Sequence, residues 1–112
     1  MRLRTPLAAT ALALTLALTN ATPSSAAVGE FEYSALNLNN TEIRDTLIDP
    51  ESGECIALPG VLNTPAFRAR NRTTSTATLF QTADCDGNTW ELQPLTGRSP
   101  LLARFRSVVF SS

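Results

Sequence analysis

Polar and apolar side chains alternate in short segments along the chain after residue 28. Residues 30–33 and 89–92 alternate strictly, and residues 105–110 end in an apolar run. A period of two places successive side chains on opposite faces of a strand. The pattern therefore predicts short strands in these three segments, and no segment after residue 28 keeps a helical period.

Turn-forming residues bound further strand-like segments. Residues 54–58 lie between an Asp-Pro-Glu-Ser-Gly turn and a Pro-Gly pair, while residues 66–71 and 73–80 are extended and rich in Thr and Arg. Residues 37–46 and 94–100 are polar or bounded by proline, and we expect loops there. Many short strands separated by regular turns are typical of an all-β sandwich or barrel.

The strand-like segments repeat in the same order, which suggests two related units. The first unit joins residues 46–48, 55–58 and 67–69. The second joins residues 78–80, 90–92 and 105–107. Chance similarity between short β segments is the alternative interpretation.

The first 27 residues differ from the rest of the chain. Arg2 and Arg4 precede an apolar run of Ala, Leu and Thr over residues 6–18, and small residues follow at 24–27. This order is typical of a helical secretory signal peptide. A membrane anchor is the alternative, but the apolar run falls short of the ~20 residues that a spanning helix needs. We therefore expect a secreted, extracellular protein with no membrane span after cleavage.

Two cleavage positions fit the small residues. The cut follows either Ala26 or Ala27, and we prefer the second, which leaves Val28 as the first residue of the mature chain. Residues 28–112 then form a single domain of about 85 residues, a size at which one modest core benefits from a covalent bridge. We expect this domain to be a monomer.

The only two cysteines, Cys55 and Cys85, both lie in the mature part. In an oxidising compartment they predict one intramolecular disulfide, which would stabilise the fold by about 3–4 kcal/mol. Free thiols or an intermolecular bridge are the alternatives.

All basic residues are arginines, because the chain contains neither Lys nor His. Two of the nine arginines precede the cut while all ten acidic residues follow it, so the mature net charge is near −3. This balance argues against a nucleic-acid partner. The use of Arg in place of Lys suggests a GC-rich, actinobacterial source.

Phe80, Gly87 and Ser107 lie at a spacing that resembles the Greek-key motif of the βγ-crystallin superfamily. The closest likeness is to its small secreted actinobacterial members, a group with killer-toxin-like and protease-inhibitor branches. The resemblance covers residues 77–110 closely and residues 46–71 loosely. It implies two Greek-key units that form a small β-sandwich. It also implies that Gly87 adopts a positive φ in a folded hairpin, which the Ser107 hydroxyl ties down.

Many members of this superfamily bind calcium through acidic or Asn residues four and five positions before the serine. Leu102 and Ala103 occupy those positions here, and Thr64 and Pro65 occupy the matching ones in the first unit. These residues offer no carboxylate to a calcium ion. We expect no metal and no cofactor, and we interpret Asp84 and Asp86 as solvated turn residues.

Candidate chemistry is sparse. Without His, the chain has no Ser-His-Asp or Cys-His arrangement and no His-based metal site. Carboxylate pairs such as Glu51 and Glu54 more often face solvent than form a glycosidase pair in so small a domain. We therefore predict a protein that is not an enzyme.

Arg68, Arg70 and Arg72 are spaced to lie on one face of a strand, and Arg106 occupies the position matching Arg68 in the second unit. Such a face could bind an anionic polymer, an acidic lipid surface or the carboxylates of a partner. The alternative is that these arginines pair with the acidic N-terminal half. Its acidic residues are Glu30, Glu32, Glu42, Asp45 and Asp49.

Three functional classes remain open. The first is a non-catalytic protein that binds an unknown extracellular protein or cell-surface component, as a killer-toxin-like protein would. The second is a protease inhibitor, whose exposed loop would present Val61 and Leu62 or Arg98. The third is a structural extracellular protein without a specific ligand.

Overall fold

A computed structural model describes residues 26–61 and 63–112, so the predicted signal peptide lies almost entirely outside the described residues. The described chain contains eight strands and no helix. They are β1 (Gly29–Leu36), β2 (Glu42–Ile48), β3 (Ile56–Ala57), β4 (Phe67–Thr73), β5 (Thr76–Phe80), β6 (Thr89–Leu92), β7 (Gly97–Arg98) and β8 (Ser107–Ser111). The prediction of an all-β chain is confirmed.

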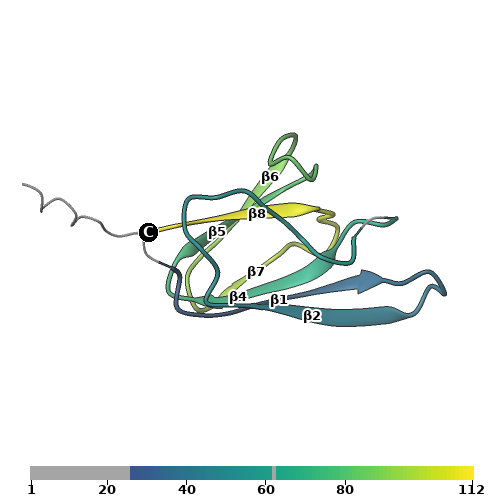
Figure 1. Cartoon of the computed structure of the whole chain (residues 1–112), viewed down its shortest axis with the longest axis horizontal. Coiled ribbons are helices and arrows are strands. Elements are labelled where there is room, and N and C mark those ends of the chain that lie inside the picture. The colour runs from purple at the N-terminus through teal and green to yellow at the C-terminus, as the bar shows by residue number, and fades with distance from the viewer. Residues whose placement is uncertain (1–25, 62) are drawn as a thin grey trace, which may run out of the picture.

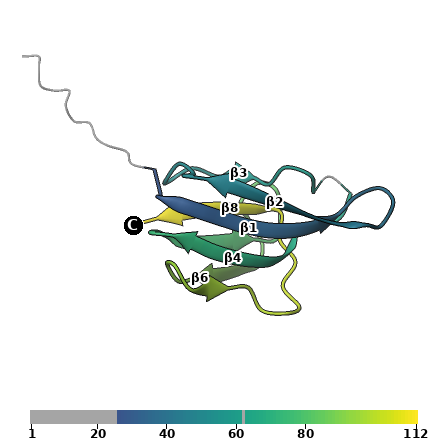
Figure 2. The same ribbon diagram turned by 90° about the horizontal axis from the view of Figure 1, so that it is seen from below.

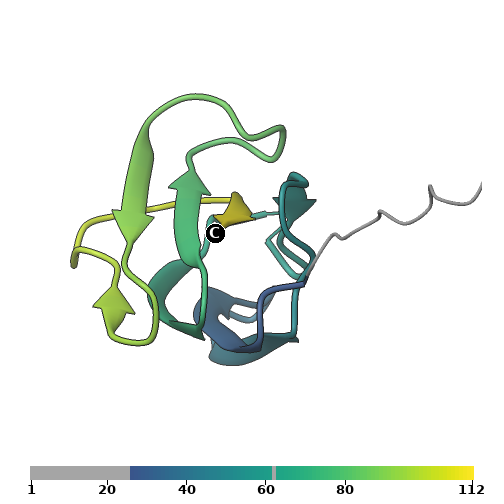
Figure 3. The ribbon, with the colours of Figure 1, turned by 90° about the vertical axis from the view of Figure 1, so that its left-hand side faces the viewer.

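The strands form two four-stranded antiparallel sheets that pack face to face, as Figures 1 and 3 show. One sheet has the order β2-β1-β4-β7 and the other has the order β3-β8-β5-β6. Each sheet therefore takes three strands from one half of the chain and one strand from the other half. Because neither half completes a sheet from its own strands, the two halves must fold together.

The core lies between the two sheets and follows the alternation in the sequence. Phe31 and Tyr33 of β1 point inward, and Phe110 of β8 meets them from the other sheet. The rings of Phe31 and Phe110 pack edge to face with centroids 5.4 Å apart, a favoured aromatic geometry. Trp90 is partly buried and packs against the same cluster. These aromatic side chains therefore hold the two layers together.

The Tyr33 hydroxyl finds polar partners although the ring is buried. It donates a hydrogen bond to the carbonyl of Pro59 at 2.8 Å, and the Asp45 carboxylate lies 3.3 Å away. Burial, reinforced by the negative charge of Asp45, raises the pKa of Tyr33 far above its usual value. The phenol therefore stays protonated, and it fastens the segment before Gly60 to the first sheet.

Two strands lie where the sequence predicts loops or turns. The first is β2, whose residues 42–46 are all exposed, so that no apolar face marks the strand in the sequence. It forms because all seven of its residues pair with β1, and the resulting hairpin extends past the other strands (Figures 1 and 2). The second is β7, a two-residue strand inside the predicted loop 94–100.

The predicted alignment of the two repeats is wrong. It matched residues 46–48 with residues 78–80, but the former lie in the edge strand β2 and the latter in the inner strand β5. By its place in the sheet, β5 corresponds to β1. Strand order is decided by hydrogen-bonded neighbours, which the local sequence of a short strand does not specify.

Candidate functional site

The outward face of the β2-β1-β4-β7 sheet gathers most of the arginines of the described chain. Arg70 and Arg72 of β4 alternate with the buried residues Ala69 and Asn71. Since alternate residues of a strand share a face, Arg70 and Arg72 point outward together. Arg98 joins them, because β7 pairs with β4 so that Arg98 lies directly opposite Arg70.

Arg68 leaves the predicted row of three arginines. The pairing of β1 with β4 shifts register between Glu32 and Ser34, and Arg68 has a φ of 56°, a left-handed value that is uncommon outside glycine. This β-bulge carries its guanidinium to β2, where one nitrogen lies 2.8 and 2.9 Å from the two Glu42 carboxylate oxygens. Arg68 is thereby committed to a partner within the chain.

The Phe67 side chain supports this end of the arginine face. The guanidinium carbon of Arg68 lies 5.5 Å from the centroid of the Phe67 ring. That of Arg104 lies 5.2 Å from it. Both distances are within the range of a cation–π contact. The aromatic ring thus holds two cationic side chains at the edge of the face.

The alternative that the arginines pair with the acidic N-terminal half holds as a salt bridge for Arg68, and Arg44 also contributes electrostatically to the lowered pKa of Glu42. The Arg68–Glu42 contact is the one salt bridge among the described residues. Hydrogen bonds from Ser34 and Arg68 lower the pKa of Glu42, so its carboxylate stays ionised. Glu32 lies opposite Arg70 in the register, and Glu30 opposite Arg72, but neither forms a salt bridge within the described chain.

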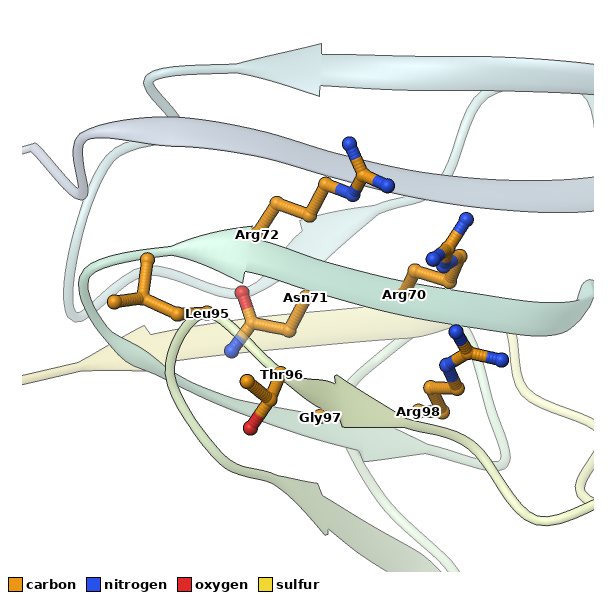
Figure 4. A pocket seen from close by; sticks show the side chains of 7 residues that line it. All are labelled: Arg70, Asn71, Arg72, Leu95, Thr96, Gly97 and Arg98. Carbon is orange, nitrogen blue, oxygen red and sulfur yellow. The ribbon is translucent and has the colours of Figure 1, made fainter.

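Two adjoining hollows open on this face. The first has a volume of about 390 Å³ and is lined by Arg70, Arg72, Arg98, Leu95 and Thr96, together with Asn71 and Gly97. Figure 4 shows Arg70 and Arg98 projecting side by side from neighbouring strands. The second hollow, of about 320 Å³, is also lined by Arg70 and Arg98 and adds Arg44, Arg68 and Leu101, with Ala69 and Ser99. The two hollows adjoin each other at this shared pair, and together they are called the arginine groove below.

A buried polar network positions β7 and its arginine. The Asn71 side chain is fully buried, and its amide nitrogen lies within hydrogen-bond distance of the carbonyls of Ser75, Leu92 and Gln93. Its oxygen accepts from the backbone N–H and the hydroxyl of Thr73. Asn71 therefore joins β4 to the turn before β5 and to the segment that leads into β7.

Arg106 lies apart from the arginine face. Its backbone N–H donates to Phe80 and its carbonyl accepts from Leu58, which places it beside the other sheet. The predicted repeat matched Arg106 to Arg68, but β4 and β8 lie in different sheets, so the two arginines do not share a face. In place of Arg106, the structure adds Arg44 and Arg98 to the groove. Sequence spacing offers no signal for them, because they come from separate strands.

The hairpin between β5 and β6 has the local geometry that the resemblance implies. Gly87 has a φ of 84°, and Ser107 lies opposite Phe80 in the register. The buried Ser107 hydroxyl donates to the carbonyl of Thr82 at 2.6 Å and accepts from the backbone N–H of Cys85 at 3.1 Å. The Ser107 hydroxyl therefore holds the turn between β5 and β6 through the backbone of Thr82 and Cys85.

The predicted disulfide is present. Cys55 and Cys85 are joined, and they lie 30 positions apart in the sequence. Cys55 immediately precedes β3, whereas Cys85 lies in the hairpin of the second half. The bridge therefore fastens the strand that the first half contributes to the second sheet.

The residues predicted for an inhibitory loop are scattered. Val61 is buried in the core, Leu62 lies outside the described residues, and Arg98 is hydrogen-bonded into a strand. Leu101 and Leu102, at 84% and 86% exposure, are instead among the most exposed apolar side chains, together with Leu38 at 84%. The sequence carried a signal for them, since two leucines directly follow Pro100, where the predicted loop 94–100 ends.

The predicted cleavage region partly belongs to the folded domain. Ala27 is fully buried and donates its N–H to the carbonyl of Pro50 at 2.8 Å. Val28 is exposed, and its N–H lies 3.2 Å from the Thr74 hydroxyl. A cut after Ala26 retains the buried methyl of Ala27, whereas a cut after Ala27 removes it.

Metal ligands and membrane-spanning elements are not seen in the part of the chain that the structure describes. Residues 26–61 and 63–112 hold no group of three His, Cys, Asp or Glu side chains that could bind a metal ion. Within the same residues no helix is long and apolar enough to cross a membrane. Asp86 accepts a hydrogen bond from Gly87, which is the behaviour of a turn residue.

The chain was compared with protein families, curated proteins and solved structures. No family of proteins, no curated protein and no solved structure matches the chain.

Proposed function

We propose that this chain is a secreted, non-catalytic binding protein that grips a negatively charged extracellular partner with its arginine groove. One observation carries the proposal. Arg44, Arg70, Arg72 and Arg98 line the arginine groove on a sheet face, and none of them forms a salt bridge with the described chain. Uncompensated charge on a rigid surface is suited to attracting and orienting an anionic partner.

The distribution of the remaining charge supports this proposal. Acidic residues outnumber arginines in residues 28–112, yet the groove is cationic. Asp84, Asp86 and Glu91 lie in or beside the β5–β6 hairpin of the other sheet. Glu30, Glu32 and Glu42 lie in the same sheet as the arginines, but no acidic residue lines either hollow. The positive charge that an anionic partner would meet is therefore concentrated in the groove.

A binding role is also favoured over catalysis by the residue types present. The chain has no His, and both Cys thiols are consumed in the disulfide. The arginines are therefore accompanied by neither an imidazole nor a free thiol, which are the commonest general base and the most nucleophilic side chain.

We further propose that the fold is a pair of Greek-key units of the βγ-crystallin type. The two sheet orders support this assignment, because each unit places its third strand in the sheet of the other. The positive φ of Gly87 and the hydrogen bonds of Ser107 support it locally. Secretion after cleavage of a signal peptide is supported by the disulfide, and the buried Ala27 favours a cut after Ala26.

The arginine groove is tested by binding to soluble polyanions. Dextran sulfate and polyglutamate are immobilised beside neutral dextran, and binding of the purified protein is measured over a range of salt concentrations. We expect binding to both polyanions that weakens as salt rises, and an about tenfold or greater loss for Arg72→Gln/Arg98→Gln.

A charge-matched control separates the groove from net charge. Asn88→Asp/Thr89→Glu lowers the net charge by the same two units on the β5–β6 hairpin. If this control loses as much affinity as the arginine double variant, or if no polyanion binds, the proposed function is wrong.

A second candidate function, protease inhibition, is favoured by the turn that carries Leu101 and Leu102. Ser99 precedes this turn and exchanges hydrogen bonds with the backbone of Ala69. Arg104 follows it and donates to the carbonyls of Leu101 and Ala103 while packing on Phe67. An exposed apolar tip held on both sides is the geometry that a tight-binding protease inhibitor requires.

Incubation with a panel of secreted proteases tests this second function. Inhibition that Leu101→Gly/Leu102→Gly abolishes, and that Leu38→Gly at the tip of the β1–β2 hairpin leaves intact, would support it. Absence of inhibition of every protease at micromolar protein would rule it out.

A further inference from the structure

Arg70 and Arg98 are directly opposite each other on neighbouring antiparallel strands. Like charges in this position repel and destabilise a sheet. Within residues 26–61 and 63–112 neither guanidinium forms a salt bridge, although Glu32 lies opposite Arg70 on its other side. The repulsion between Arg70 and Arg98 therefore destabilises the sheet locally, and a bound anion would reduce this repulsion.

The hollow beside this pair is lined by hydrogen-bond donors. Its charged groups are the guanidinium groups of Arg70, Arg72 and Arg98, and the Thr96 hydroxyl adds one neutral polar group (Figure 4). Asn71 also lines it, but its amide is engaged with backbone carbonyls inside the fold. The lining offers a cation no carboxylate, and a neutral sugar would find few acceptors for its hydroxyls.

The three guanidinium groups favour an anion that has several oxygens. A guanidinium forms paired hydrogen bonds with carboxylate, phosphate and sulfate oxygens. A carboxylate offers two oxygens, which one or two arginines satisfy. A phosphate or sulfate group offers three or four oxygens arranged in a tetrahedron, so it can accept hydrogen bonds from three arginines at once.

Resting on the proposed function, we infer that Arg70, Arg72 and Arg98 form a binding site for a tetrahedral oxyanion, a phosphate or sulfate group of the anionic partner. The second hollow shares Arg70 and Arg98 and adds Arg44. A polymer that repeats such groups can therefore occupy both hollows and cross the Arg70–Arg98 pair between them. Leu95 and Leu101, at 60% and 84% exposure, line one hollow each.

The experiment follows the side-chain Nε–H resonances of the arginines by NMR during titration of the purified protein. The probes are inorganic phosphate, inorganic sulfate, acetate and polyphosphate, at matched ionic strength. We expect phosphate and sulfate to shift the Arg70, Arg72 and Arg98 resonances to saturation, and acetate to leave them close to their starting positions. Polyphosphate should bind at least about tenfold more tightly than phosphate, since linked groups occupy two subsites at once.

Three variants make the assignment specific. Arg70→Gln and Arg98→Gln should each weaken phosphate binding by about tenfold, the usual loss for one hydrogen-bonded charge. Arg106→Gln, on the other sheet, should bind phosphate like the unmodified protein. Phosphate should also raise the thermal midpoint of the unmodified protein, and this increase should disappear in Arg70→Gln and Arg98→Gln.

Two results overturn the inference. One is a phosphate titration that shifts Arg70 and Arg98 no more than Arg106, and the other is equal phosphate binding by all three variants. If polyglutamate still binds through the groove in either case, the oxyanion site is wrong while the proposed function stands. If neither phosphate nor any polyanion binds, both are wrong.

Discussion

Replacing Asn71 with leucine should be among the most destabilising single substitutions in this protein. The side chain is fully buried and takes part in five hydrogen bonds. Leucine has a similar size and can neither donate nor accept. The substitution therefore tests the polar network with little change in packing volume.

The magnitude follows from the partners that are left behind. Each intramolecular hydrogen bond contributes about 1 kcal/mol net, and a buried group without a partner costs about 1–3 kcal/mol. The carbonyl of Gln93 keeps its bond from the Gly97 N–H, and the carbonyl of Ser75 keeps the Thr73 hydroxyl. The carbonyl of Leu92 and the N–H of Thr73 lose their Asn71 contacts. We expect a loss of about 3–5 kcal/mol, against a total stability of about 4–13 kcal/mol for a domain of this size.

Urea denaturation followed by fluorescence measures this loss, because the single tryptophan, Trp90, packs against the core. Asn88→Leu makes the same chemical change at an exposed turn position and should cost less than about 0.5 kcal/mol. Asn71→Asp keeps the shape but directs an oxygen at three carbonyls, so it should be no more stable than Asn71→Leu at neutral pH. A loss below about 1 kcal/mol for Asn71→Leu would refute the assignment of the network as the support of β7.

Three further predictions concern the fold around the site. Replacing Cys55 and Cys85 together with alanine should lower the free energy of unfolding by about 3–4 kcal/mol, and unchanged stability would show that the bridge constrains nothing. Ser107→Ala should cost about 1–3 kcal/mol in urea denaturation, because the carbonyl of Thr82 and the N–H of Cys85 lose a buried partner; Ser111→Ala, exposed on the same strand, should be neutral. The pKa of Glu42 is lower in the folded protein than its ordinary value. The Glu42 carboxylate therefore stabilises the fold fully at a pH above the ordinary pKa, and this stabilisation is lost as the pH falls through the lowered pKa. The stability difference between the unmodified protein and Glu42→Gln should therefore vanish in acid, and a difference that persists there would contradict the Arg68–Glu42 pairing.

The strand character of three segments was predictable from the sequence. Alternation marked β1 and β6, and an apolar run marked β8, because each strand turns apolar side chains into the core. The same signal fails for β2, whose side chains are exposed on both faces. It also fails for β7, since two residues carry no period at all. Both strands are defined by the backbone hydrogen bonds of a neighbour, which local side-chain patterns do not report.

The residues of the candidate site also fall into those that the sequence predicted and those that it did not. The spacing of Arg70 and Arg72 was enough to place them on one face, because both lie in one regular strand. Arg68 departed from that face at a β-bulge, and a bulge inserts an extra residue without a clear mark in the sequence. Arg44 and Arg98 joined the groove through pairing between strands that are distant in the chain.

The sequence by itself therefore determined mainly features that depend on neighbouring residues in the chain. These features include the β character of the chain and the inward-facing aromatics, which depend on residues close together in sequence, and the pairing of the only two cysteines, which have no other partner. The N-terminal signal peptide stays a prediction. Only the tertiary structure decided that each half of the chain gives a strand to the opposite sheet. That exchange brings β7, and Arg98 with it, beside Arg70. The groove exists because long-range backbone pairing, stabilised by burial of the shared core, outweighs the repulsion between the two arginines.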